Sequence, residues 1–211
     1  MINKIKTSLK LSTLILTFFI IHPKAHALDI SLFAPITYSN YHVAEGTAST
    51  SSSNRLGVGA GVTLGLGVFP FLSLETGLLN ITHAFVNSVY VSSSNLTIDK
   101  SYSFNYWQVP LLLRFSPIDS LSAQIGGYFS KNNTTSATSS RPDTLQITAP
   151  SKADDYGLMA GIGYRKSFSP LAKLRVDLMY EYGLKKLDTI PDTKLSTRSI
   201  NLWVGIMLDL I

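Results

Sequence analysis

The sequence predicts an all-β protein, an eight-stranded antiparallel up-and-down transmembrane β-barrel. The first observation is the stretch 56–69, LGVGAGVTLGLGVF, in which apolar side chains occupy every second position and glycine most of the others. A period of two indicates a β-strand with one apolar face. A nearly bare opposite face suits the crowded inside of a narrow closed barrel whose outside touches lipid.

The second observation is the N-terminal segment 1–27, MINKIKTSLKLSTLILTFFIIHPKAHA. Three lysines precede the apolar run 11–21, and a small-x-small triplet ends at Ala27. This order predicts a cleaved Sec signal peptide, cut after Ala27, with the barrel domain over 28–211. The apolar run is too short for a helical anchor, because crossing the hydrocarbon needs roughly 20 residues.

Composition narrows the function classes. The 18 basic and 13 acidic residues give a formal net charge of +5, but four lysines lie in the signal segment, so 14 basic residues face 13 acidic ones afterwards, a net charge of +1. This balance gives no reason to expect a nucleic-acid partner. The chain has no cysteine, which excludes disulfides and thiolate metal sites. An exported chain without a second apolar helix can satisfy its backbone in a membrane by closing a barrel.

The third observation is that the alternation recurs along the chain, each time with one apolar parity. We expect eight strands, at 28–41, 56–69, 72–85, 102–115, 121–129, 155–168, 174–182 and 200–210.

The connections between these strands are of two kinds. Tight turns marked by Pro70, Pro117 and Pro170 alternate with long Ser/Thr-rich loops. Short periplasmic turns and longer extracellular loops are typical of bacterial outer-membrane barrels, and an even strand count places both ends of the mature chain at the periplasmic end. The expected loops are 42–54, 87–101, 131–154 and 185–198.

Aromatic residues near both ends of the strands predict two lipid-facing girdles. The periplasmic girdle would contain Phe69, Phe71, Phe115 and Phe168, and the girdle at the loop end Tyr38, Tyr41, Phe85, Tyr102, Phe104 and Tyr182.

Three phrases, NYWQVPLLLRF, DYGLMAGIGY and LRVDLMYEYGL, give the chain a family resemblance. Over 28–211 it resembles the outer membrane protein β-barrel domain family, which includes PorT-like proteins and is related to the small barrels of the OmpA and OmpX type. The resemblance implies an eight-stranded barrel in a Gram-negative outer membrane and carries over no catalytic residue. One departure is the C-terminus, Asp209-Leu210-Ile211, where such barrels often end on an aromatic residue read by the assembly machinery.

The inward parity of the expected strands carries charged residues close to the periplasmic rim. Because an eight-stranded barrel has an interior just wide enough for side chains, these groups are expected to form a salt-bridged plug rather than the lining of a pore. We expect Glu75 to pair with Arg114, and Arg165 and Arg175 to be neutralised by Asp177 and Asp209. The predicted lumen charge cluster, a structural site, is Glu75, Arg114, Arg165, Arg175, Asp177 and Asp209.

Candidates for catalysis or metal binding are few. Past Ala27 the histidines are His42 and His83, and neither sits in a spacing typical of a metal site. Asp154-Asp155 with His83 is similar to the acid and histidine groups of outer-membrane proteases and lipid A deacylases, but no His-x-Ser phrase occurs. We therefore predict no catalytic, cofactor-binding or metal-binding residues, no cofactor and no enzymatic activity.

The predicted function is that of an integral outer-membrane barrel with a plugged lumen, acting as a structural or surface-interaction protein through its loops. The alternatives are a narrow pore and, less favoured, a lipid A-modifying or proteolytic enzyme. A soluble lipocalin-like barrel would need its apolar parity inside. The expected partners are outer-membrane lipid, the barrel-assembly machinery during insertion, and an extracellular ligand or surface partner contacted by the loops.

Overall fold

The computed structural model describes residues 28–45, 50–91, 96–140, 154–185, 187–190 and 193–210. The predicted signal peptide therefore lies outside the described residues. Nine strands occur in the described part: β1 (Leu28–Glu45), β2 (Thr50–Phe69), β3 (Leu72–Val91), β4 (Leu96–Ile118), β5 (Leu121–Ser139), β6 (Asp155–Ser167), β7 (Ala172–Gly183), β8 (Leu187–Ile190) and β9 (Thr193–Asp209).

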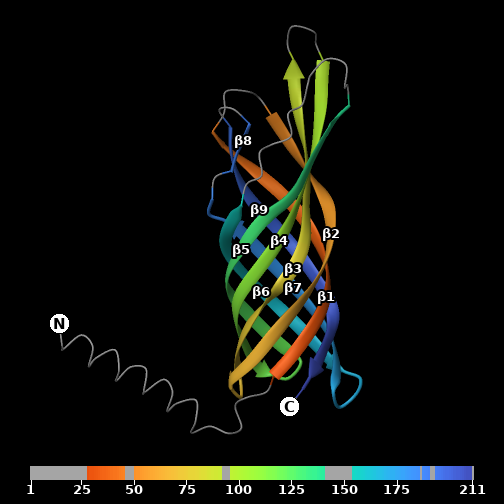
Figure 1. The fold of residues 1–211 in the computed structure, drawn as a ribbon, viewed down its shortest axis with the longest axis vertical. Helices are drawn as coiled ribbons and strands as arrows, with labels where there is room; N and C mark the ends of the chain where they lie inside the picture. Colours follow the sequence, from red (N-terminus) through yellow and green to blue (C-terminus); the bar gives the residue numbers. More distant parts are fainter. Residues whose placement is uncertain are drawn as a thin grey trace, which may run out of the picture.

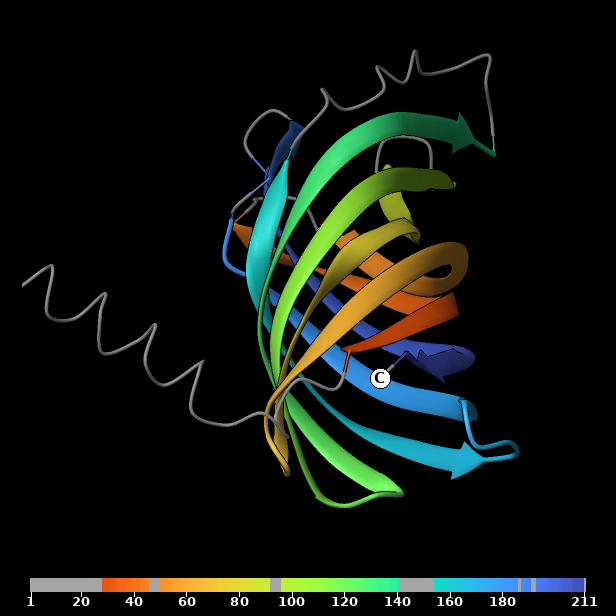
Figure 2. The same cartoon turned by 60° about the horizontal axis from the view of Figure 1, so that its bottom comes forward.

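Eight of these strands close into a barrel. Each strand from β1 to β7 pairs antiparallel with the next, β7 pairs with β9, and β9 pairs with β1 (Figures 1 and 2). The short β8 pairs only with β9 and lies outside the closed ring of strands. The predicted eight-stranded up-and-down barrel is confirmed, and closure leaves the barrel wall without an open edge.

The register fixes how steeply the strands tilt. A path of cross-strand partners that starts at Leu28 returns to β1 at Tyr38, ten residues further along (38 minus 28). A stagger of this size in an eight-stranded barrel implies strands tilted by roughly 40° and an interior that side chains fill. The partners along the path are Leu66, Leu74, Leu113, Ile125, Ala160, Tyr180 and Ile200.

The two faces of the wall follow the alternation in the sequence. Apolar side chains of one parity are exposed on the outside, with Val58 69% and Ile125 64% exposed. The glycines of β2 make room on the inside: a Cβ at Gly61 would overlap the Leu79 side chain, and a Cβ at Gly65 would lie 2.5 Å from both carboxylate oxygens of Asp29. The outer face is therefore apolar and the inner face is filled from opposing strands.

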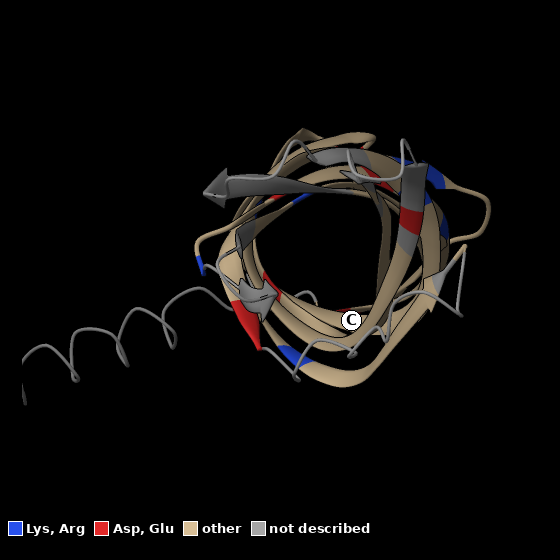
Figure 3. Cartoon of the chain, turned by 90° about the horizontal axis from the view of Figure 1, so that it is seen from above, with Lys and Arg blue, Asp and Glu red and all other residues tan. Residues whose placement is uncertain are grey.

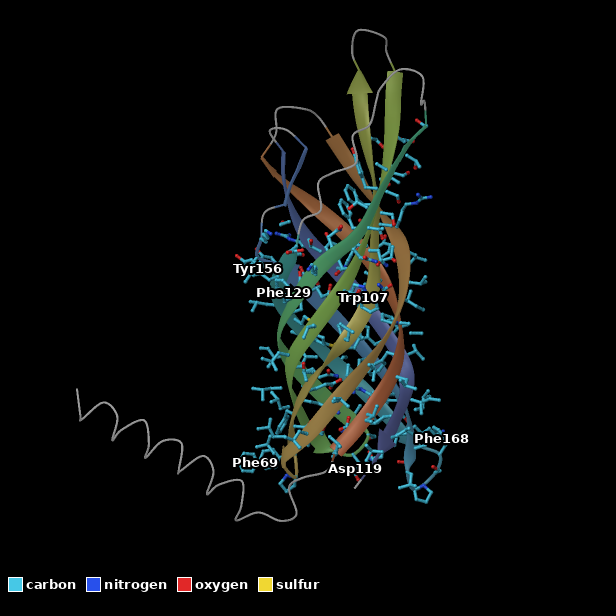
Figure 4. The ribbon with its side chains drawn as sticks, viewed as in Figure 1. Phe69, Trp107, Asp119, Phe129, Tyr156 and Phe168 are labelled. Atoms are coloured by element: carbon cyan, nitrogen blue, oxygen red, sulfur yellow. The ribbon has the colours of Figure 1, made fainter. Side chains whose placement is uncertain are left out.

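Aromatic side chains mark both ends of this apolar outer face. Figure 4 shows Trp107, Phe129 and Tyr156 at one level, and Phe69 and Phe168 at the other end of the barrel. Trp107, Phe129 and Tyr156 are 45–51% exposed, as expected for side chains that face lipid at an interface. We call the outward residues Tyr38, Trp107, Phe129, Tyr156 and Tyr182 the upper aromatic belt.

The prediction that Phe85, Tyr102 and Phe104 belong to a lipid-facing girdle was wrong. Phe85, Tyr102 and Phe104 are only 2%, 4% and 0% exposed and lie on the inward parity, where Phe85 stacks with both of the others. The alternation continues past the membrane edge, so an aromatic residue near a loop faces inward whenever its parity does. The side chain of Tyr41 lies outside the described residues.

The strands also run further than expected into the segments predicted as loops. β1 ends at Glu45 and β2 begins at Thr50, while β3 and β4 pair as far as Val91 and Leu96. β5 continues to Ser139, and β8 and the start of β9 fall within 185–198. Serine and threonine can continue a ladder when a partner strand is alongside, so each of these strands stays paired with at least one neighbour above the upper aromatic belt. At the other end, the second tight turn lies at 119–120 rather than at Pro117, which belongs to β4.

Candidate functional site: the filled barrel interior

The interior near the end with the tight turns holds a layer of ionised side chains. Arg114 on β4 and Arg175 on β7 both contact the carboxylate of Glu75 on β3, and all three side chains are buried. Arg175 binds Glu75 in a fork, with Nη1 3.0 Å from Oε1 and Nη2 2.9 Å from Oε2. A bidentate pair of this kind holds both partners in a single geometry. Glu75 therefore joins strands from different sides of the ring.

Two further carboxylates contact the arginines of this layer. Arg175 Nη2 lies 2.6 Å from Asp177 Oδ2, and Arg114 Nη1 lies 3.5 Å from Asp29 Oδ2. Arg175 also donates to the hydroxyl of Ser31 at 3.1 Å. Buried charges are tolerated when they are paired and hydrogen-bonded. We call Asp29, Glu75, Arg114, Arg175 and Asp177 the ionic layer.

The rim beneath the ionic layer differs from the predicted pairing. Asp209 pairs with Lys173, Nζ to Oδ2 2.6 Å, and both side chains are about a quarter exposed. Arg165 donates to the Ser116 hydroxyl at 2.6 Å and forms no ion pair with a carboxylate among the described residues. The prediction that Arg165 and Arg175 share Asp177 and Asp209 therefore holds only for Arg175 with Asp177. Asp209 lies at the end of β9 beside the start of β7, which brings Lys173 closer to it than either arginine.

These rim residues face a recess at the end of the barrel with the tight turns. It has a volume of about 420 Å³ and is lined among others by Asp29, Phe71, Arg165, Lys173 and Asp209. Asp29 belongs both to the lining of this recess and to the ionic layer.

An apolar layer lies across the middle of the interior. Trp203 packs against Phe33 with ring centroids 5.5 Å apart, and the guanidinium of Arg175 lies 4.7 Å from the centre of the Phe33 ring. The ionic layer and the apolar layer are therefore in direct contact. The apolar layer consists of Phe33, Leu79, Ile81, Leu112, Tyr128, Met159, Met179 and Trp203.

A third layer, again polar, lies on the loop side of the apolar layer. Glu181 accepts hydrogen bonds from Gln108 at 2.7 Å and from Ser199 at 2.8 Å. His83 Nδ1 lies 2.8 Å from the Ser39 hydroxyl, and its Nε2 lies 3.9 Å from Glu181. We call these five residues the upper polar layer. Tyr128 of the apolar layer donates to Asp155 at 3.0 Å.

The upper polar layer contains His83, one of the possible catalytic residues considered from the sequence. His83 faces Glu181 and Ser39, and all three side chains are buried inside the barrel. Asp154 accepts a hydrogen bond from the backbone of Asn132, away from His83. The side chain of His42 lies outside the described residues. No group of three or more potential metal ligands occurs in the described part of the chain.

Several interior residues were not named in the predicted cluster. Asp29 stands on the inward parity of the first strand between Leu28 and Ile30, so the alternation alone could have found it. Gln108 and Glu181 also follow the inward parity. Their association could not be found this way, because β4 and β7 are not neighbours in the ring. Viewed along the barrel axis, charged segments lie on several strands of the ring (Figure 3).

Comparison with known proteins identifies a family with this architecture. The sequence profile of the outer membrane protein beta-barrel domain family matches residues 22–189. No curated protein sequence matches the chain. The described residues contain no helix with the length and apolar character of a membrane span.

Solved structures share the fold at low sequence identity. The outer membrane protein OprG from Pseudomonas aeruginosa has a TM-score of 0.59 at 12% identity, covering 88% of this chain and 96% of that chain. The outer membrane protein AlkL, solved in lipid bilayers, has a TM-score of 0.51 at 13% identity, covering 87% and 89%. With its closed barrel, apolar outer face and matching profile, the chain belongs to the outer membrane protein β-barrel domain family.

Proposed function

We propose that this outer-membrane barrel acts as a structural or surface-interaction protein whose lumen is plugged. The observation that carries the proposal is the apolar layer between two polar layers. Leu79, Leu112, Met179 and Trp203 are each 0% exposed, and they project inward from four different strands. Hydrated ions need polar surroundings, and a dry apolar cross-section opposes their passage.

The strand extensions support the part of the proposal that concerns partners outside the cell. Above the upper aromatic belt, β3 and β4 remain paired from His83 and Phe104 to Val91 and Leu96, and β5 pairs with β4 up to Ser139. A paired sheet is a stiffer support for loops than single chains would be. Insertion by the barrel-assembly machinery, which recognises barrels of this kind, is part of the same proposal.

A narrow pore and an enzyme are less well supported. A pore requires the apolar layer and the ionic layer to move aside together. An enzyme requires one of the buried acid and histidine groups to reach a substrate, and Glu181 and His83 are 0% and 3% exposed.

Recording from planar bilayers tests the plugged lumen. We expect purified, folded barrel to give no stable open channels. Stable channels would favour the pore. Profiling of lipid A from cells with and without the protein tests the enzyme, and we expect identical profiles.

An inserted epitope tests whether the loops face outward. A tag placed directly after Ser140, at the end of the β5 extension, should be detected by antibody on intact cells. A tag after Asp119, in the tight turn labelled in Figure 4, should be detected only after the outer membrane is permeabilised. The reverse pattern would contradict the proposed orientation.

A further inference from the structure

Three buried polar atoms on the inner wall have no hydrogen-bond partner among the residues that the structure describes. They are Ser122 Oγ and Gln124 Nε2 on β5 and Asp177 Oδ1 on β7. The three residues are only 6%, 3% and 0% exposed, so bulk solvent does not satisfy these atoms. Buried polar groups in folded proteins are hydrogen-bonded with few exceptions, and each exception calls for an explanation.

Gly163 on β6 is the point on which these three atoms converge. In the ladder, Gly163 lies between Ser122 on one side and Asp177 on the other. A Cβ at Gly163 would overlap Asp177 Oδ1, and it would lie 2.6 Å from Ser122 Oγ and 3.1 Å from Gln124 Nε2. The three atoms therefore surround the bare backbone of Gly163, yet none of them forms a hydrogen bond with another.

The donors and acceptors around Gly163 define what can bind there. Arg175 Nη2 lies 3.4 Å from Gln124 Oε1 and 2.6 Å from Asp177 Oδ2. Because the amide oxygen of Gln124 accepts from Arg175, the NH2 group of Gln124 is the part that faces Gly163. The place thus offers a carboxylate acceptor, an amide donor and a hydroxyl that can do both. Arg175 would repel a cation and Asp177 an anion, so a neutral molecule that both donates and accepts fits best.

We propose that a water molecule is bound at Gly163 as a permanent part of the ionic layer. It donates to Asp177 Oδ1, accepts from Gln124 Nε2 and shares a third hydrogen bond with Ser122. About three hydrogen bonds are typical of a buried water. The water links β5 to β7 across β6, at a position where any residue larger than glycine would take its place. The inference does not rest on the proposed surface role, and it holds whether or not the loops bind a partner.

Nuclear magnetic resonance of the full mature barrel, isotope-labelled and held in lipid bicelles, tests the site. Magnetisation transfer between water and the side-chain amide protons of Gln124 is recorded as NOE and as ROE. Opposite signs of the two identify a water that stays bound while the protein tumbles, whereas equal signs identify freely moving water. The matched control is Gln108, which is also buried and whose Nε2 donates to Glu181 at 2.7 Å and lies 3.8 Å from Met159 Sδ.

We expect a bound-water signal at Gln124 and none at Gln108. Gly163→Ala should abolish the signal, because the added Cβ takes the place of the water. Ser122→Ala should retain it, since Asp177 and Gln124 still hold the water. If Gly163→Ala does not fold, as judged by heat-dependent gel mobility, Ser122→Val fills the same space with methyl groups and should abolish the signal in its stead.

Absence of the signal at Gln124 in the wild type would overturn the proposal, as would its persistence in the variants that fill the site. Equal signs of NOE and ROE at both glutamines would overturn it as well, because water would then move freely through the interior. A shift of the Gln124 amide resonances when sodium chloride is replaced by choline chloride would identify a bound cation in place of water.

Discussion

Glu75→Ala removes the carboxylate that the buried Arg114 and Arg175 both contact. Arg114 keeps Asp29 at 3.5 Å, and Arg175 keeps Asp177 at 2.6 Å. Neither guanidinium can leave the interior, because Arg114 is 1% and Arg175 0% exposed. The substitution therefore leaves each guanidinium with one carboxylate partner instead of two, in a place that water reaches poorly.

The loss of unfolding free energy expected for Glu75→Ala follows from these contacts. Removing one partner of a buried ion pair costs about 3–5 kcal/mol, and the remaining contacts to Asp29 and Asp177 place Glu75→Ala near 3 kcal/mol. Adding Arg114→Ala removes a guanidinium that has already lost its contact with Glu75, so the double variant should regain about 1–2 kcal/mol relative to the sum of the single losses.

Urea unfolding in lipid vesicles, followed by tryptophan fluorescence, measures this double-mutant cycle. The matched control is the cycle for Lys173 and Asp209 at the rim, an ion pair whose side chains are 24% and 28% exposed. Its coupling should be about 0.2–1 kcal/mol, because solvent screens it. Additivity within about 0.3–0.5 kcal/mol in the Glu75 cycle would mean that the residues do not interact, and would refute the reasoning for the whole ionic layer.

Three more changes probe the remaining parts of the interior by the same unfolding assay. Trp203→Ala should cost about 3–5 kcal/mol because it opens a cavity in the apolar layer, and a loss below about 1 kcal/mol would show that the layer is loosely packed. Gly126→Ala should strongly destabilise the barrel, because the added Cβ would overlap the carbonyl oxygen of Leu111. The control is Gly127→Ala, which should cost less because the nearest atom lies 3.1 Å from the added Cβ. Equal effects of the two substitutions would argue against the register of β4 and β5. Glu181→Ala should cost about 1–3 kcal/mol and Glu181→Gln less, since the amide oxygen still accepts a hydrogen bond in the upper polar layer, and equal costs would contradict that role.

The faces of the barrel could be predicted from the sequence because alternation needs no knowledge of distant contacts. Glu75, Arg114, Arg175 and Asp177 lie on the inward parity and are buried, as the period of two implies. Partner choice is different, because it depends on which side chains reach across the lumen. Glu75 and Arg175 are 100 residues apart and come from strands that are not adjacent.

The limits of the strands were harder to predict for a related reason. Composition marks a segment rich in serine and threonine as a loop, but β5 continues through such a segment to Ser139 because β4 runs alongside it. Phe85 on β3 and Phe104 on β4 were expected to face lipid, but both lie on the inward parity of their strands and are buried. Alternation thus predicts which side chains face the lumen and which face outward. Where each strand ends depends on its pairing with neighbouring strands, which the alternation does not show.

Thiol labelling tests the filled lumen most directly, because the chain has no cysteine of its own. Single cysteines would replace Leu79 in the apolar layer and Ser73 in the recess at the end with the tight turns, and a charged, water-soluble thiol reagent would be applied to both sides of the reconstituted membrane. A filled lumen predicts rapid labelling at position 73 and none at position 79. A cysteine at the lipid-facing position of Leu78 should react only with a lipid-soluble reagent, since Leu78 is 45% exposed on the outer face. Labelling at position 79 as fast as at position 73 would mean that water and solutes cross the apolar layer, and would contradict the account.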